Sequence, residues 1–277
     1  MNKILTLYNI EFKRIYKLYF ALIGILFIGN IGGVVKSLYD SIEKISNENN
    51  IPMNLDILNS SIGFNIIKQF TVKDIYIYGS LLLGICVLMC LIYSLIIWYR
   101  DYYSKSKTIY TLLSLPQPRF NIYLSKLITI VVMIYGLIVS QFLFWYIDLN
   151  IVKIMADISS PSFTNIYTNM MQLERELNIV SPYIIEFLMI DVVGVILAVV
   201  VVFTCVLLER AFRKIGMLLG ITYALLSLIG YICIIGVNST NFRTLLISHI
   251  IYYILLFTLS IFISYRLINK RFFIEGR

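Results

Sequence analysis

Residues 75–99 read IYIYGSLLLGICVLMCLIYSLIIWY and contain no charged side chain. A helix needs about 20 apolar residues to cross a hydrocarbon core of roughly 30 Å, and this stretch exceeds that length. In lipid every backbone N–H and C=O group needs a partner within the protein, which an isolated strand does not provide. The stretch also lacks the alternating polarity of an outer-membrane barrel strand. Residues 75–99 therefore predict a transmembrane helix.

Five further apolar segments have the same character and are bounded or interrupted by few charges. They cover residues 18–35, 127–147, 183–208, 215–237 and 244–265. The chain of 277 residues is 60% hydrophobic and 14% charged, whereas a soluble domain is about half apolar and a quarter charged. This composition excludes a water-soluble globule and a disordered chain. We expect an all-α integral membrane protein with six transmembrane helices, forming a single transmembrane domain over residues 1–277.

Basic residues gather on one side of the predicted membrane. Four segments on that side hold 16 basic and 4 acidic residues, and three segments on the other side hold 7 basic and 11 acidic residues. The basic segments are 1–17, 99–126, 209–214 and 266–277, and the others are 36–74, 148–191 and 238–243. The positive-inside rule then places both termini in the cytoplasm. We expect the chain to be a multi-pass protein of a bacterial plasma membrane. The net charge of +8 is explained by topology and lipid headgroups rather than by nucleic acid.

Residues 3–17 predict an amphipathic helix that lies in the inner headgroup layer before the first span. At 100° per residue, polar side chains such as Lys13 and Arg14 fall on one arc, opposite an arc of Ile, Leu, Tyr and Phe. Glu11 is an exception to this division. The alternative is a simple N-terminal extension of the first span.

The longest cytoplasmic stretch is the segment of residues 99–126. Within it, residues 105–115 predict a short helix that Leu115–Pro116–Gln117–Pro118 ends, because proline removes a donor and restricts the residue before it. A short helix held between two spans can transmit motion from a cytoplasmic partner. The alternative is an interfacial hairpin with basic headgroup anchors.

The exterior segments 36–74 and 148–182 are too long for turns and are expected to hold short helices. These either cap the outer mouth of a translocation path or decorate the surface. Glu186 and Asp191 are candidates for lining a water-filled outer vestibule. Gly216 and Gly220 form a G-x-x-x-G motif, which allows close helix packing within the chain or between two chains.

Sequence signals of catalysis and metal binding are missing. The chain has no G-x-x-x-x-G-K-[ST] phosphate loop, and its only histidine, His249, excludes a histidine-rich metal site. Ionisable groups near the middle of the spans, which membrane proteases and proton-coupled carriers need, are almost absent. We therefore expect a chain that is not an enzyme and that itself holds no cofactor and no metal.

Together these features resemble the permease subunits of type-2 ABC transporters. The resemblance rests on the basic segment LYNIEFKRIYK of residues 7–17, the six-span topology, and YRDYYSK of residues 99–105 followed by LPQPR of residues 115–119. The Tyr-, Ile-, Asn- and Lys-rich composition is typical of a low-GC Gram-positive bacterium. A narrower likeness is to the staphylococcal exporters of phenol-soluble modulins, which are amphipathic peptide toxins.

The resemblance implies a type-2 ABC exporter permease that pairs with a second permease chain, identical or paralogous. It also implies two copies of a separate ABC ATPase subunit, which would bind the ATP and magnesium. Residues 105–115 would be the main coupling helix, and residues 3–17 and the turn 209–214 would be secondary contacts. The implied main contacts are Lys105, Lys107, Thr108, Tyr110 and Arg119, and the implied secondary contacts are Lys13, Arg14, Glu209 and Arg213.

The nearly uncharged spans favour hydrophobic or amphipathic cargo, such as peptides or lipid-like molecules, because a small ion would need denser oxygen ligands or charges. Candidate cavity-lining residues are Tyr78, Tyr93, Tyr135, Trp145 and Tyr223, each with lipid contact or helix packing as its alternative. The predicted function is export of hydrophobic or amphipathic molecules out of a Gram-positive bacterium. Peptides are the leading class, and the export would release toxin or antimicrobial peptides or give immunity to them. The alternative is a six-span sensor or assembly scaffold. An intramembrane enzyme is disfavoured because no nucleophile–base pair is visible.

Overall fold

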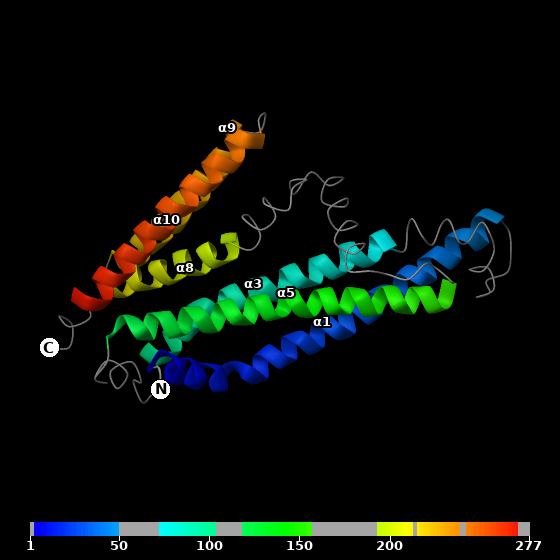
Figure 1. The fold of residues 1–277 in the computed structure, drawn as a ribbon, viewed down its shortest axis with the longest axis horizontal. Coiled ribbons are helices and arrows are strands. Elements are labelled where there is room, and N and C mark those ends of the chain that lie inside the picture. Colours follow the sequence, from blue (N-terminus) through cyan, green and yellow to red (C-terminus); the bar gives the residue numbers. More distant parts are fainter. Residues whose placement is uncertain are drawn as a thin grey trace. The chain divides into compact units, whose positions relative to one another are not determined.

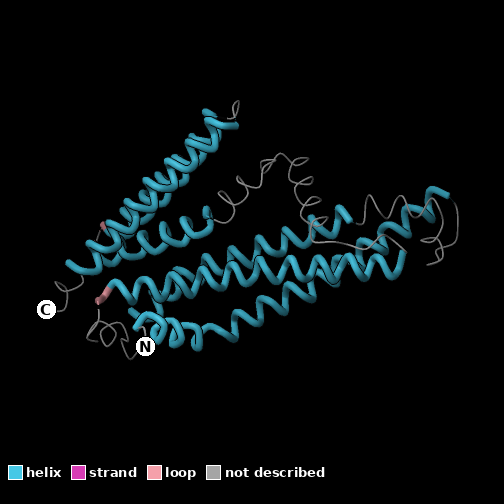
Figure 2. Tube along the Cα trace, viewed as in Figure 1, coloured by secondary structure: helices cyan, strands magenta, loops and turns pink. Residues whose placement is uncertain are grey.

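The computed structural model describes residues 3–49, 72–103, 118–156, 193–212, 215–238 and 242–270. This part of the chain is helical apart from short turns and contains no strand (Figures 1 and 2). The all-α prediction is therefore confirmed for the described residues. The helices are α1 (Lys3–Asn49), α3 (Val72–Tyr103), α5 (Phe120–Ala156), α8 (Gly194–Ala211), α9 (Gly216–Asn238) and α10 (Phe242–Lys270).

Each of these six helices is long and apolar enough to cross a membrane. The predicted spans at 18–35, 75–99 and 127–147 lie inside α1, α3 and α5, and the last two predicted spans coincide with α9 and α10. α8 contains residues 194–208 of the fourth predicted span, whose residues 183–192 lie outside the described part. The described part of the chain thus holds six helices able to cross a membrane, and the protein is a multi-pass membrane protein. The exact bounds of the spans stay a prediction.

α1 is one continuous helix of 47 residues. At 1.5 Å per residue it is about 70 Å long, which is about twice the thickness of a hydrocarbon core. Residues 3–17 therefore run into the first span without a break, as in the N-terminal extension considered above. The same helix continues to Asn49, so the predicted exterior segment 36–74 begins as helix.

The chain divides into two compact units, each assembled from segments distant in sequence. Unit 1 contains Met1–Ile15, Met89–Met133 and Tyr183–Arg277, and unit 2 contains Tyr16–Leu88 and Ile134–Pro182. α1, α3 and α5 contribute to both units, whereas α8, α9 and α10 belong to unit 1. The expectation that all six spans form one domain stays a prediction.

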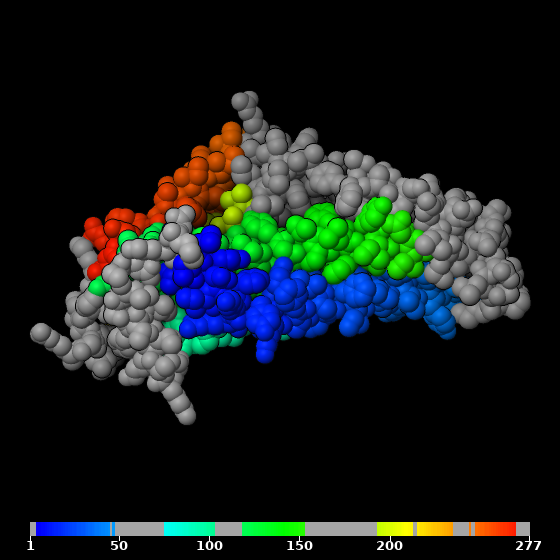
Figure 3. Space-filling model, turned by 60° about the horizontal axis from the view of Figure 1, so that its bottom comes forward, coloured from blue at the N-terminus to red at the C-terminus, as the bar shows by residue number. Residues whose placement is uncertain are grey.

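Unit 2 is a packing of α1, α3 and α5, and Figure 3 shows the side chains of α1 and α5 meeting along it. Tyr76 packs edge-on against Trp145 with ring centroids 5.4 Å apart. Gly79 of α3 faces a polar spot beside this pair, because a Cβ there would lie 2.6 Å from Gln141 Nε2 and 2.9 Å from Asn30 Oδ1. The buried hydrophobic core consists of Val34, Leu38, Ile75, Tyr76, Trp145 and Val152.

In unit 1, α9 lies closely against α8. A Cβ on Gly220 would lie 2.9 Å from the carbonyl oxygen of Cys205, and a Cβ on Gly216 would meet that of Glu209. The two glycines of the G-x-x-x-G motif thus serve packing within the chain, as small residues do in membrane helix pairs. α10 packs on α8 and α9 through hydroxyl contacts, one of which joins Tyr223 OH to Ser260 Oγ at 2.6 Å.

Candidate functional site

Five charged side chains from three helices of unit 1 meet at the end of α3. We call this group the charge cluster, and it consists of Glu11 and Arg14 of α1, Arg100 and Asp101 of α3, and Lys126 of α5. Lys126 is central. Its Nζ donates to Glu11 Oε1 at 2.8 Å and to Asp101 Oδ2, so this one amine joins all three helices.

Two arginines complete the charge cluster from its outer side. Arg100 Nη2 donates to Glu11 Oε2 at 2.8 Å, and Arg100 Nη1 donates to Tyr93 OH at 2.7 Å. Arg14 Nη1 lies 3.4 Å from Asp101 Oδ1 and 3.7 Å from Glu11 Oε1. Both carboxylates are therefore shared between Lys126 and at least one guanidinium group.

The centre of the charge cluster is withdrawn from solvent. The side chains of Lys126, Asp101 and Glu11 are 0%, 1% and 5% exposed. Charges this deep are tolerated only when they are paired and hydrogen-bonded, because desolvation of an isolated ion is very costly. Three cations face two carboxylates, and the two arginines are 35% and 31% exposed, so the surplus positive charge stays near water.

An aromatic layer packs directly beside the charge cluster and connects α3, α5, α8 and α10. Lys126 Nζ lies 5.5 Å from the centroid of the Trp98 ring, within cation–π range. Trp98 in turn packs edge-on against Phe203, with centroids 5.6 Å apart. Such ring pairs stabilise a contact beyond the area they bury. The layer comprises Trp98, Phe120, Tyr123, Phe203 and Tyr265.

The end of α3 is also joined to the end of α8. Tyr99 OH donates to Glu209 Oε2. The guanidinium carbon of Arg210 lies 4.9 Å from the centroid of Tyr99 and 5.0 Å from that of Tyr102. The last turns of α3 therefore contact the ends of α1, α5 and α8 through polar side chains. This is the region from which the predicted coupling segment emerges, since α3 ends at Tyr103 and α5 begins at Phe120.

The structure brings together two of the predicted coupling residues, Arg14 and Glu209, at this end of α3. Lys13 is exposed on α1, and Arg119 forms the turn that starts α5, where its carbonyl oxygen accepts from Ile122 N at 3.0 Å. The remaining predicted residues lie outside the described residues: Lys105, Lys107, Thr108, Tyr110 and Arg213, and also Glu186 and Asp191 of the predicted vestibule.

The predicted cavity-lining residues have separate environments. Tyr93 accepts the hydrogen bond from Arg100, and Tyr223 bonds to Ser260. In unit 2, Trp145 is 1% exposed in the core, while Tyr78 is exposed and has Lys36 Nζ 5.4 Å from its ring centroid. Tyr135 is partly buried on α5. Their role in a transport path stays a prediction.

Four residues of the charge cluster, Glu11, Arg100, Asp101 and Lys126, were not predicted as contact residues from the sequence. One signal did point to them. Glu11 interrupts the apolar arc of residues 3–17, and an acidic residue on the buried side of a helix requires a cationic partner. The sequence does not identify the cationic partner, which is Lys126, 115 residues further along the chain.

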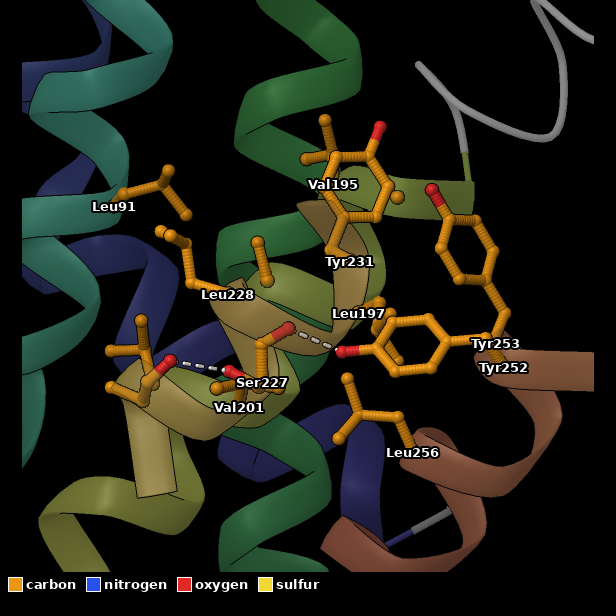
Figure 4. A pocket seen from close by; sticks show the side chains of 14 residues that line it. Leu91, Val195, Leu197, Val201, Ser227, Leu228, Tyr231, Tyr252, Tyr253 and Leu256 are labelled. Carbon is orange, nitrogen blue, oxygen red and sulfur yellow. Dashed lines mark hydrogen bonds between the residues drawn. The ribbon is translucent and has the colours of Figure 1, made fainter. Parts of the chain in front are cut away.

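A second candidate site is an apolar pocket in unit 1, with a volume of about 510 Å³ (Figure 4). Its walls come from α8, α9 and α10 and from Leu91 of α3. None of the five predicted cavity-lining residues belongs to its described lining. Within the described part of the chain, no group of three or more His, Cys, Asp or Glu side chains is placed to hold a metal ion.

No family model matches this chain, and no curated protein or solved structure matches it either. In the part that the structure describes the chain is helical, and its six long apolar helices make it a multi-pass membrane protein.

Proposed function

We propose that this chain is the membrane-spanning permease subunit of an ATP-driven exporter of the ABC type. The observation that carries the proposal is the convergence of three helix ends on the end of α3 through the charge cluster and the Tyr99–Glu209 hydrogen bond. A permease must convert a push from a soluble ATPase into movement of its spans. A group of helix ends that ion pairs and hydrogen bonds hold together, next to the predicted docking segment, is suited to that task.

The proposed mechanism treats the end of α3 as a lever. ATP-driven closure of two partner ATPase subunits would displace the segment between α3 and α5. Because the ion pairs of the charge cluster join α1, α3 and α5, the ends of these three helices would move together rather than one at a time. Packed elements of this kind switch between discrete arrangements, here the inward-open and outward-open states. ATP and magnesium would act on the partner, and this chain would form the path.

The proposed cargo is hydrophobic or amphipathic, with peptides as the leading class. This follows from the composition of the spans, which carry few charges to compensate an ionic cargo. The proposed setting is the plasma membrane of a Gram-positive bacterium, with both termini in the cytoplasm and a second permease chain alongside. A six-span sensor or assembly scaffold is the alternative, because it would use the same apolar helices without an ATPase.

Co-purification tests the proposal directly. The tagged chain would be extracted from its native membrane in mild detergent, and its partners would be identified by mass spectrometry. We expect a stoichiometric ABC ATPase. Its absence under conditions that retain other subunit contacts would favour the sensor or scaffold.

A triple variant, Lys105→Ala, Lys107→Ala and Thr108→Ala, tests the docking segment. It should recruit less ATPase or uncouple ATP hydrolysis from transport, while membrane insertion remains normal. The matched control removes two lysines and one hydroxyl from the opposite predicted side, by Lys36→Ala, Lys44→Ala and Ser46→Ala. Unchanged recruitment and transport in the first variant would refute the assignment.

A further inference from the structure

The apolar pocket of unit 1 has two chemically different ends. In Figure 4 the rings of Tyr231 and Tyr253 lie at one end of the view, away from Leu91 and Val201. The two rings are stacked, with centroids 6.5 Å apart and planes at 17°. His249, which is 2% exposed, packs edge-on against both rings and fixes their positions.

A glycine makes room for the Tyr253 hydroxyl at the tyrosine end. A Cβ on Gly194 would lie 3.1 Å from Tyr253 OH, so the hydroxyl occupies room that any larger residue would reduce. A third phenol, Tyr252, donates its hydroxyl to the carbonyl oxygen of Ser227 and so closes one side of the pocket (Figure 4). A phenol can both donate and accept a hydrogen bond, so this end can recognise a hydroxyl or carbonyl group.

The rest of the lining is mostly aliphatic and includes Leu91, Val201 and Leu256. The Ser227 hydroxyl, which lies beside Val201 in Figure 4, already donates to the Ala224 carbonyl oxygen. The pocket extends along α8 from Gly194 to Val202. The eight helical steps from Gly194 to Val202 rise about 12 Å, so the pocket is elongated along α8. No residue in the described lining carries a charge. A charged ligand group inside the pocket would therefore be uncompensated and unfavourable.

The pocket reaches the apolar surface of the protein. Leu228 belongs to its lining and is 57% exposed on α9. The surface around it on α9 carries further exposed side chains, including Leu225, Leu226 and Ile229. Because α9 is long and apolar enough to cross a membrane, we expect this surface to face the hydrocarbon. A ligand would enter sideways from the bilayer.

We propose that this pocket is a binding site for an uncharged amphiphile taken from the bilayer. The hydrocarbon chain lies along α8 against the aliphatic side chains, and a hydroxyl or carbonyl group of the ligand reaches Tyr231 and Tyr253. The volume of about 510 Å³ is within the range of small-molecule sites. This inference is independent of transport and of any ATPase partner.

Photolabelling of the full-length chain in lipid nanodiscs tests the site. The probe is 1-octanol with a diazirine on its chain, and the labelled residues are located by mass spectrometry. We expect saturable labelling on α8, α9 and α10 at pocket residues, with unlabelled 1-octanol as competitor. Labelling that does not saturate, or that spreads evenly over exposed residues of all six helices, would overturn the proposal.

Pocket-filling variants provide the matched comparison. Ala198→Leu and Ala224→Leu each extend a side chain into the lining, and each should lower labelling at the pocket about tenfold, equivalent to about 1.4 kcal/mol. Ala21→Leu makes the same change on the exposed surface of α1 and should leave labelling at the pocket unchanged. Two separate filling variants protect the test against one that fails to fold. Full labelling in a folded filling variant would refute the site.

The tyrosine end is tested by headgroup selectivity. The double variant Tyr231→Phe and Tyr253→Phe keeps both rings but removes both hydroxyls. Competition by 1-octanol should weaken about two- to tenfold, the range of one hydrogen bond, while competition by n-octane stays the same. Equal weakening for both competitors would show that the hydroxyls do not recognise the ligand, and would overturn the proposed orientation.

Discussion

Asn30 of α1 and Gln141 of α5 exchange two side-chain hydrogen bonds within unit 2, although 111 residues separate them in sequence. Asn30 Nδ2 donates to Gln141 Oε1 at 3.1 Å, and Gln141 Nε2 donates to Asn30 Oδ1 at 2.8 Å. Both side chains are buried, and both helices are apolar around them. A reciprocal amide pair satisfies most of its own polar atoms, so it specifies how two otherwise similar apolar helices align.

Replacing one partner of this pair should destabilise unit 2 more than replacing both. Gln141→Leu leaves the Asn30 amide partly unsatisfied, at an expected cost of about 1 to 2 kcal/mol. The double variant Asn30→Leu with Gln141→Leu should recover part of that loss. Thermal unfolding in detergent measures both effects, with Asn150→Leu as a control because the Asn150 amide donates within its own helix, to the Tyr146 carbonyl oxygen. A double variant that loses as much as the sum of its single variants would contradict this account.

Gly79 should be intolerant of even one added methyl group. A Cβ there would contact Trp145, Gln141 and Asn30, and overpacking of this kind costs about 1 to 3 kcal/mol. Gly79→Ala should therefore lower the unfolding temperature and the yield of folded protein. Gly84→Ala is the matched control, since it lies on the same helix and a Cβ there meets nothing within 4 Å. Equal behaviour of the two variants would show that the polar spot has spare room.

Lys126 should be required for the helix ends to stay together. Lys126→Met removes an amine that contacts both Glu11 and Asp101, and breaking a buried ion pair costs about 3 to 5 kcal/mol. Lys13→Met, on the exposed side of α1, should cost little. Protease sensitivity of the purified chain and its unfolding temperature report the difference. If the chain is the proposed permease, Lys126→Met should also reduce ATPase stimulation by cargo.

The G-x-x-x-G motif should govern the α8–α9 contact and leave the oligomeric state unaffected. Gly220→Val would place atoms against the Cys205 carbonyl group and push the two helices apart. We expect a lower unfolding temperature with an unchanged mass in solution, measured by light scattering in detergent. Gly32→Val is the control, because a Cβ at Gly32 has open space. A change from dimer to monomer in the Gly220 variant alone would assign the motif to a contact between chains.

Local chemistry accounts for what could be predicted from the residues alone. An apolar run such as residues 75–99 satisfies its backbone within itself, so its length and composition are sufficient to identify a membrane-spanning helix. The same reasoning predicted a span at residues 127–147, which lies inside α5, although α5 itself begins earlier, at Phe120. Hydropathy did not predict the two ends of α1, because this helix continues past the apolar segment 18–35 into polar sequence on both sides.

The helical class, the six apolar helices and the charge asymmetry could be predicted from the residues, because each follows from properties of single segments. Which polar residues meet could not, because it depends on how the helices pack in three dimensions. Lys126 is adjacent in sequence to neither Glu11 nor Asp101, and Asn30 could pair with any amide at the same depth. Side-chain pairing between helices depends on their relative rotation and height. Those are set by the packing of many residues at once, including glycines such as Gly79 whose importance is the absence of a side chain.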